Sequence, residues 1–173
     1  MFDFTQILLV CALCLAPIYL TEIDAVIIDY EEQGAIPYDD DYETMLNNGM
    51  VLNQTLQSLP SSGNTFLIAN KTFHLIGGII ASDIEDLVIQ LEGTLSFSND
   101  RDTWPTGADG HVLEAIYLTN VRNFTLTSTG TGTLDGNGQK WWGAIKFLKY
   151  QENRPRLFHV SGSQQVLIVN ILF

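Results

Sequence analysis

A motif that recurs along the second half of the chain constrains its fold more than any other feature. Three segments share the same order of an apolar strand, a polar turn and a second apolar strand: 80–89, 118–126 and 160–168. When Asp83, Asn120 and Gly162 are aligned, the repeats lie 37 and then 42 residues apart. Self-similarity at such a period is typical of stacked repeats, because one repeat cannot bury its own apolar side chains.

The form of the repeat favours a parallel β-helix over a propeller. Each repeat supplies three short strands, and its extra length falls in one variable place, at 98–111 and again at 136–155. In a stack, such insertions become loops on one side, which is commonly the binding side. The predicted core consists of inward-facing apolar residues: Leu87, Ile89, Leu95, Phe124, Leu126 and Leu134. We therefore expect an all-β fold with parallel strands.

A single helix is expected before the repeats, after a short strand at 26–30. The acidic run 39–41 can cap its first turn, since carboxylates suit the positive end of the helix dipole. Its apolar residues fall near one face: Met45, Leu52, Leu56 and Leu59. Gly49 weakens the centre, and Pro60 ends the helix. We expect this helix to cap the N-terminal end of the stack, where it would hide strand edges.

The chain stops at Phe173 within an apolar strand. This predicts a β-helix domain, 26–173, that is truncated at its C-terminal end and belongs to a longer protein. A naturally short β-solenoid is the alternative.

The leader is an apolar run at 7–20, shorter than the ~20 residues that a helix needs to cross a bilayer. This length predicts a signal peptide over 1–25, cleaved near Ala25, and therefore secretion to the extracellular space or cell wall. Because 1–6 carries no Lys or Arg, an uncleaved anchor or a buried segment is the alternative. Both cysteines, Cys11 and Cys14, lie in the run, so the mature chain would have no disulfide.

Charge narrows the choice of partners. The net charge of −12 argues against nucleic acid, whose phosphates need clustered Lys and Arg. Most of the basic residues fall in one segment: Lys140, Lys146, Lys149, Arg154 and Arg156. Three N-x-[ST] acceptors, at Asn53, Asn70 and Asn123, are compatible with a eukaryotic secretory route.

The most distinctive motif is the run GTGTLDGNGQKWW at 130–142, followed by NRPRLF at 153–158. It resembles the signature of the polygalacturonases, a glycoside hydrolase family, in which Gly-x-Ile/Leu-Asp-Gly-x-Gly-x-x-Trp-Trp precedes an Arg-Pro pair. The resemblance covers about 28–173, and its specific part is the block 130–158. It implies a secreted, monomeric, right-handed parallel β-helix that hydrolyses an anionic pectic polysaccharide by inversion and needs no cofactor.

The motif also has a purely structural interpretation. Gly136 and Gly138 would let the chain turn with positive φ after a strand, and Asn137 tolerates the same region. Trp141 and Trp142 would then cover the rim of the coil. The alternative is that a tryptophan or a basic residue of the loop contacts sugar.

The catalytic residues of the family have no counterpart in this sequence. Inverting hydrolysis needs two carboxyl groups ~6.5 to 9.5 Å apart, and the family supplies its site with Asn-Thr-Asp, Asp-Asp, Gly-His-Gly and Arg-x-Lys motifs. An Asp-Asp dipeptide occurs within 39–41, where it is better explained as a helix cap. Gly110-His111 precedes the signature, whereas the family's histidine follows it. We therefore predict no catalytic residue in this chain, and leave substrate-binding residues unassigned.

Other chemistries find no support. His74, His111 and His159 are scattered and have no cysteine partners, so we predict no metal site and no cofactor site. A non-catalytic β-solenoid that binds carbohydrate or a surface is the main rival, and a pectate lyase is a third possibility. Endo or exo action and the particular pectic polymer stay open.

Overall fold

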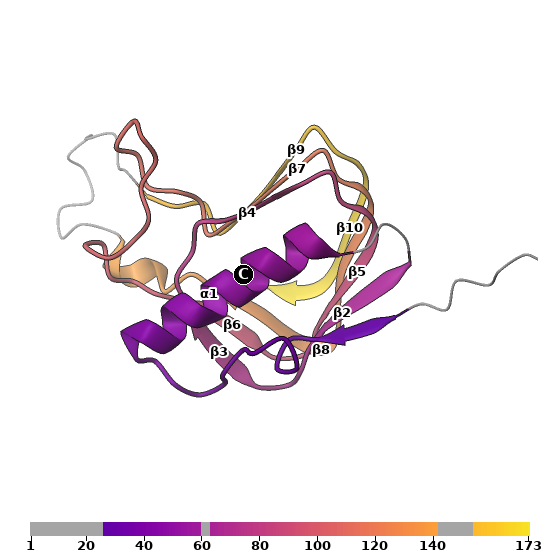
Figure 1. Cartoon of the computed structure of the whole chain (residues 1–173), viewed down its shortest axis with the longest axis horizontal. Helices are drawn as coiled ribbons and strands as arrows, with labels where there is room; N and C mark the ends of the chain where they lie inside the picture. The colour runs from indigo at the N-terminus through magenta and orange to yellow at the C-terminus, as the bar shows by residue number, and fades with distance from the viewer. Residues whose placement is uncertain (1–25, 60–62, 142–153) are drawn as a thin grey trace, which may run out of the picture.

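The computed structural model describes residues 26–59, 63–141 and 154–173 (Figure 1). The predicted leader, with both cysteines, and Trp142 lie outside these ranges. The described part consists mostly of parallel β-strands with one α-helix, so the predicted all-β class is confirmed. Within the same residues, no helix is long and apolar enough to cross a membrane.

The elements in chain order are β1 (Ile27–Asp29), α1 (Tyr42–Ser58), β2 (Asn64–Ile68), β3 (Thr72–Leu75), β4 (Ile79–Ser82), β5 (Glu85–Leu91), β6 (Thr94–Phe97), β7 (Ile116–Thr119), β8 (Arg122–Asp135), the 3₁₀ turn η2 (Gly138–Lys140), β9 (Phe158–Ser161) and β10 (Gln164–Leu172). One sheet has the order β4-β7-β9, and the other has the order β1-β2-β5-β8-β6-β3, with β10 also paired to β8. Each strand thus lies beside its counterpart in the next repeat (Figure 1).

The predicted register of the repeats is confirmed. Ser82 pairs with Thr119, and Thr119 with Ser161, in parallel. The next residue in each repeat turns the chain in the left-handed region, with φ of 59° at Asp83, 52° at Asn120 and 60° at Gly162. Asn and Asp tolerate this region because their short side chains bond locally, and here the Asn120 amide donates to the Asp83 carboxylate.

One repeat departs from the prediction of three separate short strands. β8 is continuous over 14 residues; its first half pairs with β5 and its second half with β6. The chain bends between the halves without ending the strand, because the Ser128 hydroxyl accepts from the amides of Gly130 and Gly132. From the preceding repeat, the Glu92 carboxylate accepts from the amide and the hydroxyl of Thr129.

The predicted core is confirmed. The six inward-facing residues that the sequence indicates are at most 6% exposed: Leu87, Ile89, Leu95, Phe124, Leu126 and Leu134. Leu87 pairs with Phe124 and Ile89 with Leu126, so apolar side chains form continuous rows through successive repeats. Burying such rows supplies the main driving force for folding.

Helix α1 begins where predicted and lies across one end of the stacked strands (Figure 1). Asp41 is the N-cap, and its side chain accepts from the amide of Glu43. The buried face differs from the prediction, because Met45 and Leu59 are only half-buried. Leu52 and Leu56 are buried beside them, at 1% and 3% exposure, and the face also includes a polar residue, Asn48.

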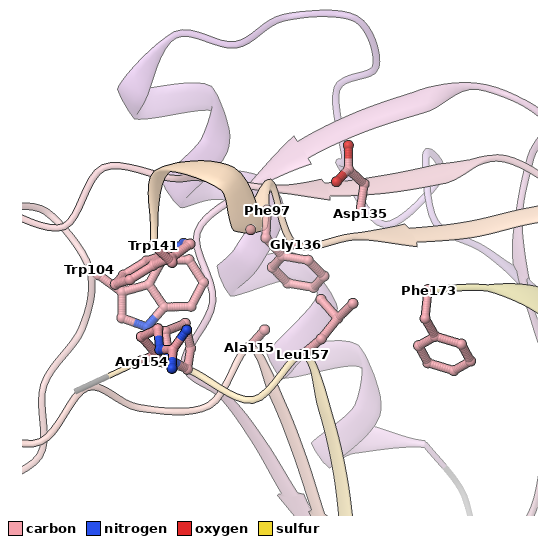
Figure 2. Close-up of a pocket in the computed structure, with 11 residues that line it drawn as sticks. Phe97, Trp104, Ala115, Asp135, Gly136, Trp141, Arg154, Leu157 and Phe173 are labelled. Carbon is pink, nitrogen blue, oxygen red and sulfur yellow. The ribbon is translucent and has the colours of Figure 1, made fainter. Parts of the chain in front are cut away.

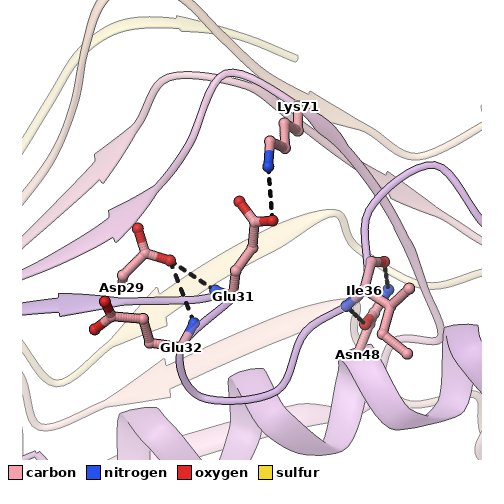
Figure 3. Close-up of polar contacts among 6 residues, drawn as sticks. All are labelled: Asp29, Glu31, Glu32, Ile36, Asn48 and Lys71. Atoms are coloured by element: carbon pink, nitrogen blue, oxygen red, sulfur yellow. Dashed lines mark hydrogen bonds and ion pairs between the residues drawn. The ribbon is translucent and has the colours of Figure 1, made fainter.

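Asn48 and Gly49 explain how the helix sits so close to the strands. The Asn48 amide donates to the Ile36 carbonyl at 2.8 Å, and its oxygen accepts from the Ile36 amide at 2.8 Å (Figure 3). The same amide nitrogen donates to the His74 carbonyl at 2.8 Å. A Cβ on Gly49 would lie 2.5 Å from the carbonyl oxygen of Ile76. The glycine that seemed to weaken the helix is therefore required for its contact with the coil.

A polar turn after β1 closes the same corner of the molecule. The Asp29 carboxylate accepts from the amides of Glu31 and Glu32 at 2.8 and 3.4 Å, and the ammonium of Lys71 lies 2.7 Å from Glu31 (Figure 3). The Glu31 carboxylate raises the pKa of Lys71, chiefly through this hydrogen bond. The first strand is thereby tied to the turn between β2 and β3.

Candidate functional site

The signature folds as a strand, a left-handed turn and a 3₁₀ turn. Asn137, after the end of β8, has φ of 47°, whereas Gly136 and Gly138 do not have positive φ. The prediction of positive φ at the two glycines is therefore wrong, whereas the prediction that Asn137 tolerates this region is confirmed. The reason is a side-chain anchor: the Asn137 amide donates to the Ser96 hydroxyl at 3.0 Å and to the Phe97 carbonyl at 2.8 Å.

A cavity of about 470 Å³ opens beside this turn (Figure 2). Trp104 and Trp141 pack edge to face, with ring centroids 5.1 Å apart, at one side of it, and Phe173 lies at the other. The indole nitrogen of Trp104 donates to the Leu113 carbonyl at 2.8 Å. Trp141 is 4% exposed, so it packs against the coil as the structural interpretation of the motif predicted.

Trp141 also has features that packing alone leaves unexplained. Its indole nitrogen is buried without a hydrogen-bond partner among the described residues. The guanidinium of Arg101 lies 5.5 Å from its ring centroid, which is within range of a cation–π contact. The same cavity is lined by Asp135 and Arg154, so it is apolar with charged groups at its margin.

A second group of side chains lies on the outer face of the sheet β4-β7-β9. Tyr117 and His159 are partners on neighbouring strands, and their rings stack with centroids 4.7 Å apart and planes at 16°. The Tyr117 hydroxyl lies 2.9 Å from the hydroxyl of Ser161. The Nδ1 atom of His159 lies 2.6 Å from the carboxylate of Glu114, which also holds the guanidinium of Arg156 at 3.3 Å.

We call these four residues, Glu114, Tyr117, Arg156 and His159, the outer-face cluster. The Arg156 side chain is 67% exposed, whereas those of His159 and Glu114 are 28% and 23% exposed. Glu114 thus positions an imidazole and a cation, and the cation faces solvent. Such a surface can attract a carboxylate and offer hydroxyl and ring contacts to a sugar. It contains one carboxylate, so it cannot supply the acid and base that glycoside hydrolysis needs.

The acidic run 39–41 acts as a helix cap, as predicted. The Asp39 carboxylate accepts from the amide of Asp41 at 3.0 Å and from the hydroxyl of Thr44 at 2.9 Å. These two hydrogen bonds lower the pKa of Asp39, in that order of size. His111 lies in the loop after β6, where its amide donates to Asp109 and its carbonyl accepts from Gly107.

Sequence reasoning missed the outer-face cluster and treated His159 as an ordinary strand residue. The signal was available, because the alignment of Asn120 with Gly162 also aligns Tyr117 with His159. Within the described part of the chain, no group of three or more His, Cys, Asp or Glu side chains could hold a metal ion. Most of the basic segment, including Lys146 and Lys149, lies outside the described residues.

Comparison with curated proteins finds relatives among fungal enzymes. The chain is 30% identical over 118 residues to endo-xylogalacturonan hydrolase A of Aspergillus tubingensis, which covers 68% of this chain and 28% of that protein. It is 24% identical over 117 residues to an alpha-L-rhamnosidase of Aspergillus niger, covering 65% and 27% of the two chains. It is 27% identical over 114 residues to the probable exopolygalacturonase X of Aspergillus fumigatus, covering 63% and 25%. No protein-family model matches the chain, and no solved structure matches it with statistical significance.

The xylogalacturonan hydrolases and the exopolygalacturonase among these relatives define the class, because they are pectin-degrading glycoside hydrolases. Several of them are enzymes of the polygalacturonase family, so the resemblance inferred from the signature is confirmed and the chain is a homologue of that family. The chain spans about a quarter of the length of the curated relatives that it matches.

Proposed function

We propose that this chain supplies the helix-capped N-terminal coils of a right-handed parallel β-helix enzyme, and that the intact protein hydrolyses pectic, galacturonan-type polysaccharide by inversion. The observation that carries the proposal is the similarity to pectin-degrading hydrolases. The signature at 130–142 also supports it, because this run resembles the one that polygalacturonases carry.

The parallel pairing supports the β-helix. β4, β7 and β9 pair in order on one side, and β2, β5, β8 and β10 pair in order on another. A chain that returns to pair in parallel with its own previous turn winds as a coil. Crossover connections between parallel strands of one sheet are right-handed in nearly all proteins, which favours that hand here.

The outer-face cluster supports a role in holding the polymer. Arg156 offers a solvent-facing cation to galacturonate carboxylates, and the Tyr117–His159 pair offers ring edges and a hydroxyl to the sugar. The acid and base are proposed to come from elsewhere in the intact protein, because the acidic run 39–41 is engaged in capping. We further propose secretion after removal of 1–25, a monomeric intact enzyme and no nucleic-acid partner.

The test uses the longest protein encoded by the transcript that contains this segment. Incubated with polygalacturonan and with xylogalacturonan, it should release reducing ends. Proton NMR should show the β-anomer first, because inversion at an α-linkage yields it. The chain 26–173 is the matched control and should release none. Product of retained α-configuration, or hydrolysis by the control, would contradict the proposal.

A non-catalytic β-solenoid is the second candidate, and the outer-face cluster is the observation that favours it. In that case an oligogalacturonate should bind without being cleaved, with an affinity that falls as salt rises. Arg156→Gln should weaken binding several-fold, whereas Arg122→Gln, a cation on β8, should leave it unchanged. Titration calorimetry on the intact protein separates this candidate from the hydrolase.

A further inference from the structure

The structure separates the three N-x-[ST] acceptors by what each asparagine side chain does. We propose that Asn70 is the position that carries an N-linked glycan in the folded, exported protein, and that Asn53 is not. This inference rests on the proposed secretion and on no assumption about catalysis. Sequence alone treats the three triplets as equal, because each satisfies the same acceptor pattern.

Asn70 is free to carry a glycan. It lies in an exposed bend between β2, which ends at Ile68, and β3, which begins at Thr72. Its side chain has no hydrogen-bond partner among the residues that the structure describes. A sugar on its amide nitrogen would therefore extend into solvent without breaking a contact of the fold.

The backbone around Asn70 is held firmly, so the acceptor is presented at a fixed corner. The amide of Thr94 donates to the Lys71 carbonyl at 2.9 Å, and the amide of Glu92 donates to the Ile68 carbonyl at 2.8 Å. A Cβ at Gly93 would lie 2.1 Å from the Lys71 carbonyl oxygen, so the next repeat packs directly on this turn. The neighbouring coil contacts the backbone of the turn and leaves its asparagine side chain exposed.

Asn53 is engaged in docking the helix. It lies within α1, and its carbonyl oxygen accepts from the amide of Ile80 at 2.9 Å. The adjacent Gln57 amide bonds both to the Asn53 oxygen, at 3.4 Å, and to the Ile80 carbonyl, at 2.8 Å. Thr55, which completes this triplet, is 6% exposed. A glycan would attach to the Asn53 amide nitrogen, directly beside the oxygen that bonds to β4 and to Gln57, so a bulky sugar there would crowd the contact between helix and strand.

The side chain of Asn123 is intermediate between those of Asn70 and Asn53, because it is exposed and also bonded to a neighbouring repeat. It is exposed, yet its φ is 48° and its amide nitrogen donates to the Asp86 carboxylate at 2.6 Å. Glycosylation replaces one of the two hydrogens on that nitrogen with a bulky sugar, so it would crowd the contact with the preceding repeat. We expect occupancy to fall in the order Asn70, Asn123, Asn53.

The reaction itself is a simple transfer. The amide nitrogen of Asn70 forms a bond to the anomeric carbon of a lipid-linked oligosaccharide diphosphate. The bond from that carbon to the diphosphate oxygen breaks, the lipid diphosphate leaves, and the amide gives up one proton. No oxidant or reductant takes part. Thr72 supplies the hydroxyl that the acceptor triplet requires.

The experiment expresses the whole chain in yeast behind a cleavable export leader, with an added acceptor triplet at the C-terminus as a control for entry into the pathway. The soluble exported fraction is trimmed to one N-acetylglucosamine per site and mapped by peptide mass spectrometry. We expect occupancy at Asn70 to exceed that at Asn53 at least tenfold. Thr72→Val should abolish the modification at Asn70, and Thr72→Ser should retain it.

Two mapping results would overturn the inference: occupancy at Asn53 above one tenth of that at Asn70 in the soluble fraction, or an unmodified Asn70 in chains whose added triplet is modified. A thermal melt adds a readout that does not depend on export. Asn70→Gln should leave the melting temperature of unglycosylated protein unchanged, whereas Asn53→Gln should lower it. Equal effects of the two substitutions would also count against it. Because no activity is measured, failure of the hydrolase proposal would leave these outcomes unaffected.

Discussion

The two ends of the stacked strands contain the same kind of residue in different surroundings. Leu87, Phe124 and Val166 occupy one inward-facing row, and their exposed fractions are 2%, 0% and 38%. Ile168, in the neighbouring row, is 40% exposed. The difference does not come from residue type; it comes from whether another layer covers the row, as α1 does at the first end with Leu52 and Leu56.

The helix does more than bury apolar surface, since it also satisfies the strand edges. Asn48 bonds to the carbonyl of His74 on β3, and Asn53 and Gln57 bond to the two backbone groups of Ile80 on β4. An unpaired edge of a strand is a template for association with another chain. At the β10 end, an exposed apolar row and an open edge occur together. Among the described residues, the end beneath α1 is thus both covered and paired, and the β10 row is neither.

The largest expected effect is a loss of folding stability at the end that α1 covers. Leu52→Ala should destabilise the fold by ~2 to 5 kcal/mol, because it removes buried methyl groups and leaves a cavity between helix and coil. In the chain 26–173, Ile168→Ala changes the exposed row, so it is the matched control and should cost much less. Urea unfolding of the two variants measures the difference. Equal losses would show that the two ends are equally buried in solution.

The next effect tests the polar anchor of the helix. Asn48→Ala should cost about 1 to 3 kcal/mol, because the carbonyls of Ile36 and His74 lose their donor inside the structure. Asn47→Ala removes a single exposed bond to the Gly34 carbonyl and serves as the control. Chemical denaturation of both should give a clear difference in midpoint. A neutral Asn48→Ala would mean that the hydrogen bonds of this side chain do not stabilise the docked helix.

The third effect concerns association at the exposed end. We expect the chain 26–173 to associate through this exposed row, and Ile168→Lys should shift it from oligomer towards monomer. The substitution should change its stability by only about 0.5 kcal/mol, since the position is partly solvated in this chain. Leu167→Lys changes a neighbouring residue of the same strand that belongs to the opposite face. Sedimentation velocity should show a larger effect for the first. If the two substitutions lower the oligomer fraction equally, the strand edge and not the apolar row drives association.

The smallest expected effect concerns the middle of the stack. Hydrogen bonds from Thr129, above all from its hydroxyl, lower the pKa of the Glu92 carboxyl below its ordinary value. A group whose pKa is lower in the folded state stabilises the fold above its unfolded pKa, and this contribution is lost as pH falls through the folded value. Stability should therefore decline slightly on acidification, and Glu92→Gln should flatten that decline. Urea midpoints at neutral and acid pH provide the measurement, and an unchanged decline would exclude this carboxylate as its source.

The sequence predicted the features that repeat and missed those that depend on contacts between distant segments. Alternating apolar residues and turn residues at Asp83, Asn120 and Gly162 were sufficient to predict the register and the core. The role of Asn48 could not be foreseen, because its partners lie 12 and 26 residues away. Positive φ was predicted at Gly136 and Gly138 and only tolerated at Asn137. It occurs at Asn137 because the amide of this side chain bonds to a neighbouring coil, which local propensity does not include.

The outer-face cluster could be predicted from the sequence only in part. Its stacked pair follows from the register, so it was accessible once the repeats were aligned. Its third and fourth members, Glu114 and Arg156, come from the segments that lead into β7 and β9. Their meeting depends on the path of two loops, and nothing in the local sequence fixes that path.

The contact between Gly49 and the carbonyl of Ile76 has a consequence for protein engineering. At this crossing point no side chain lies between them, so backbone atoms limit how closely the helix approaches the coil. A designer who wished to graft this cap onto the opposite end, or onto another repeat protein, would need a glycine at the crossing point. If Leu52 and Leu56 were copied without this glycine, a side chain at the crossing point would hold the transplanted helix too far from the strands.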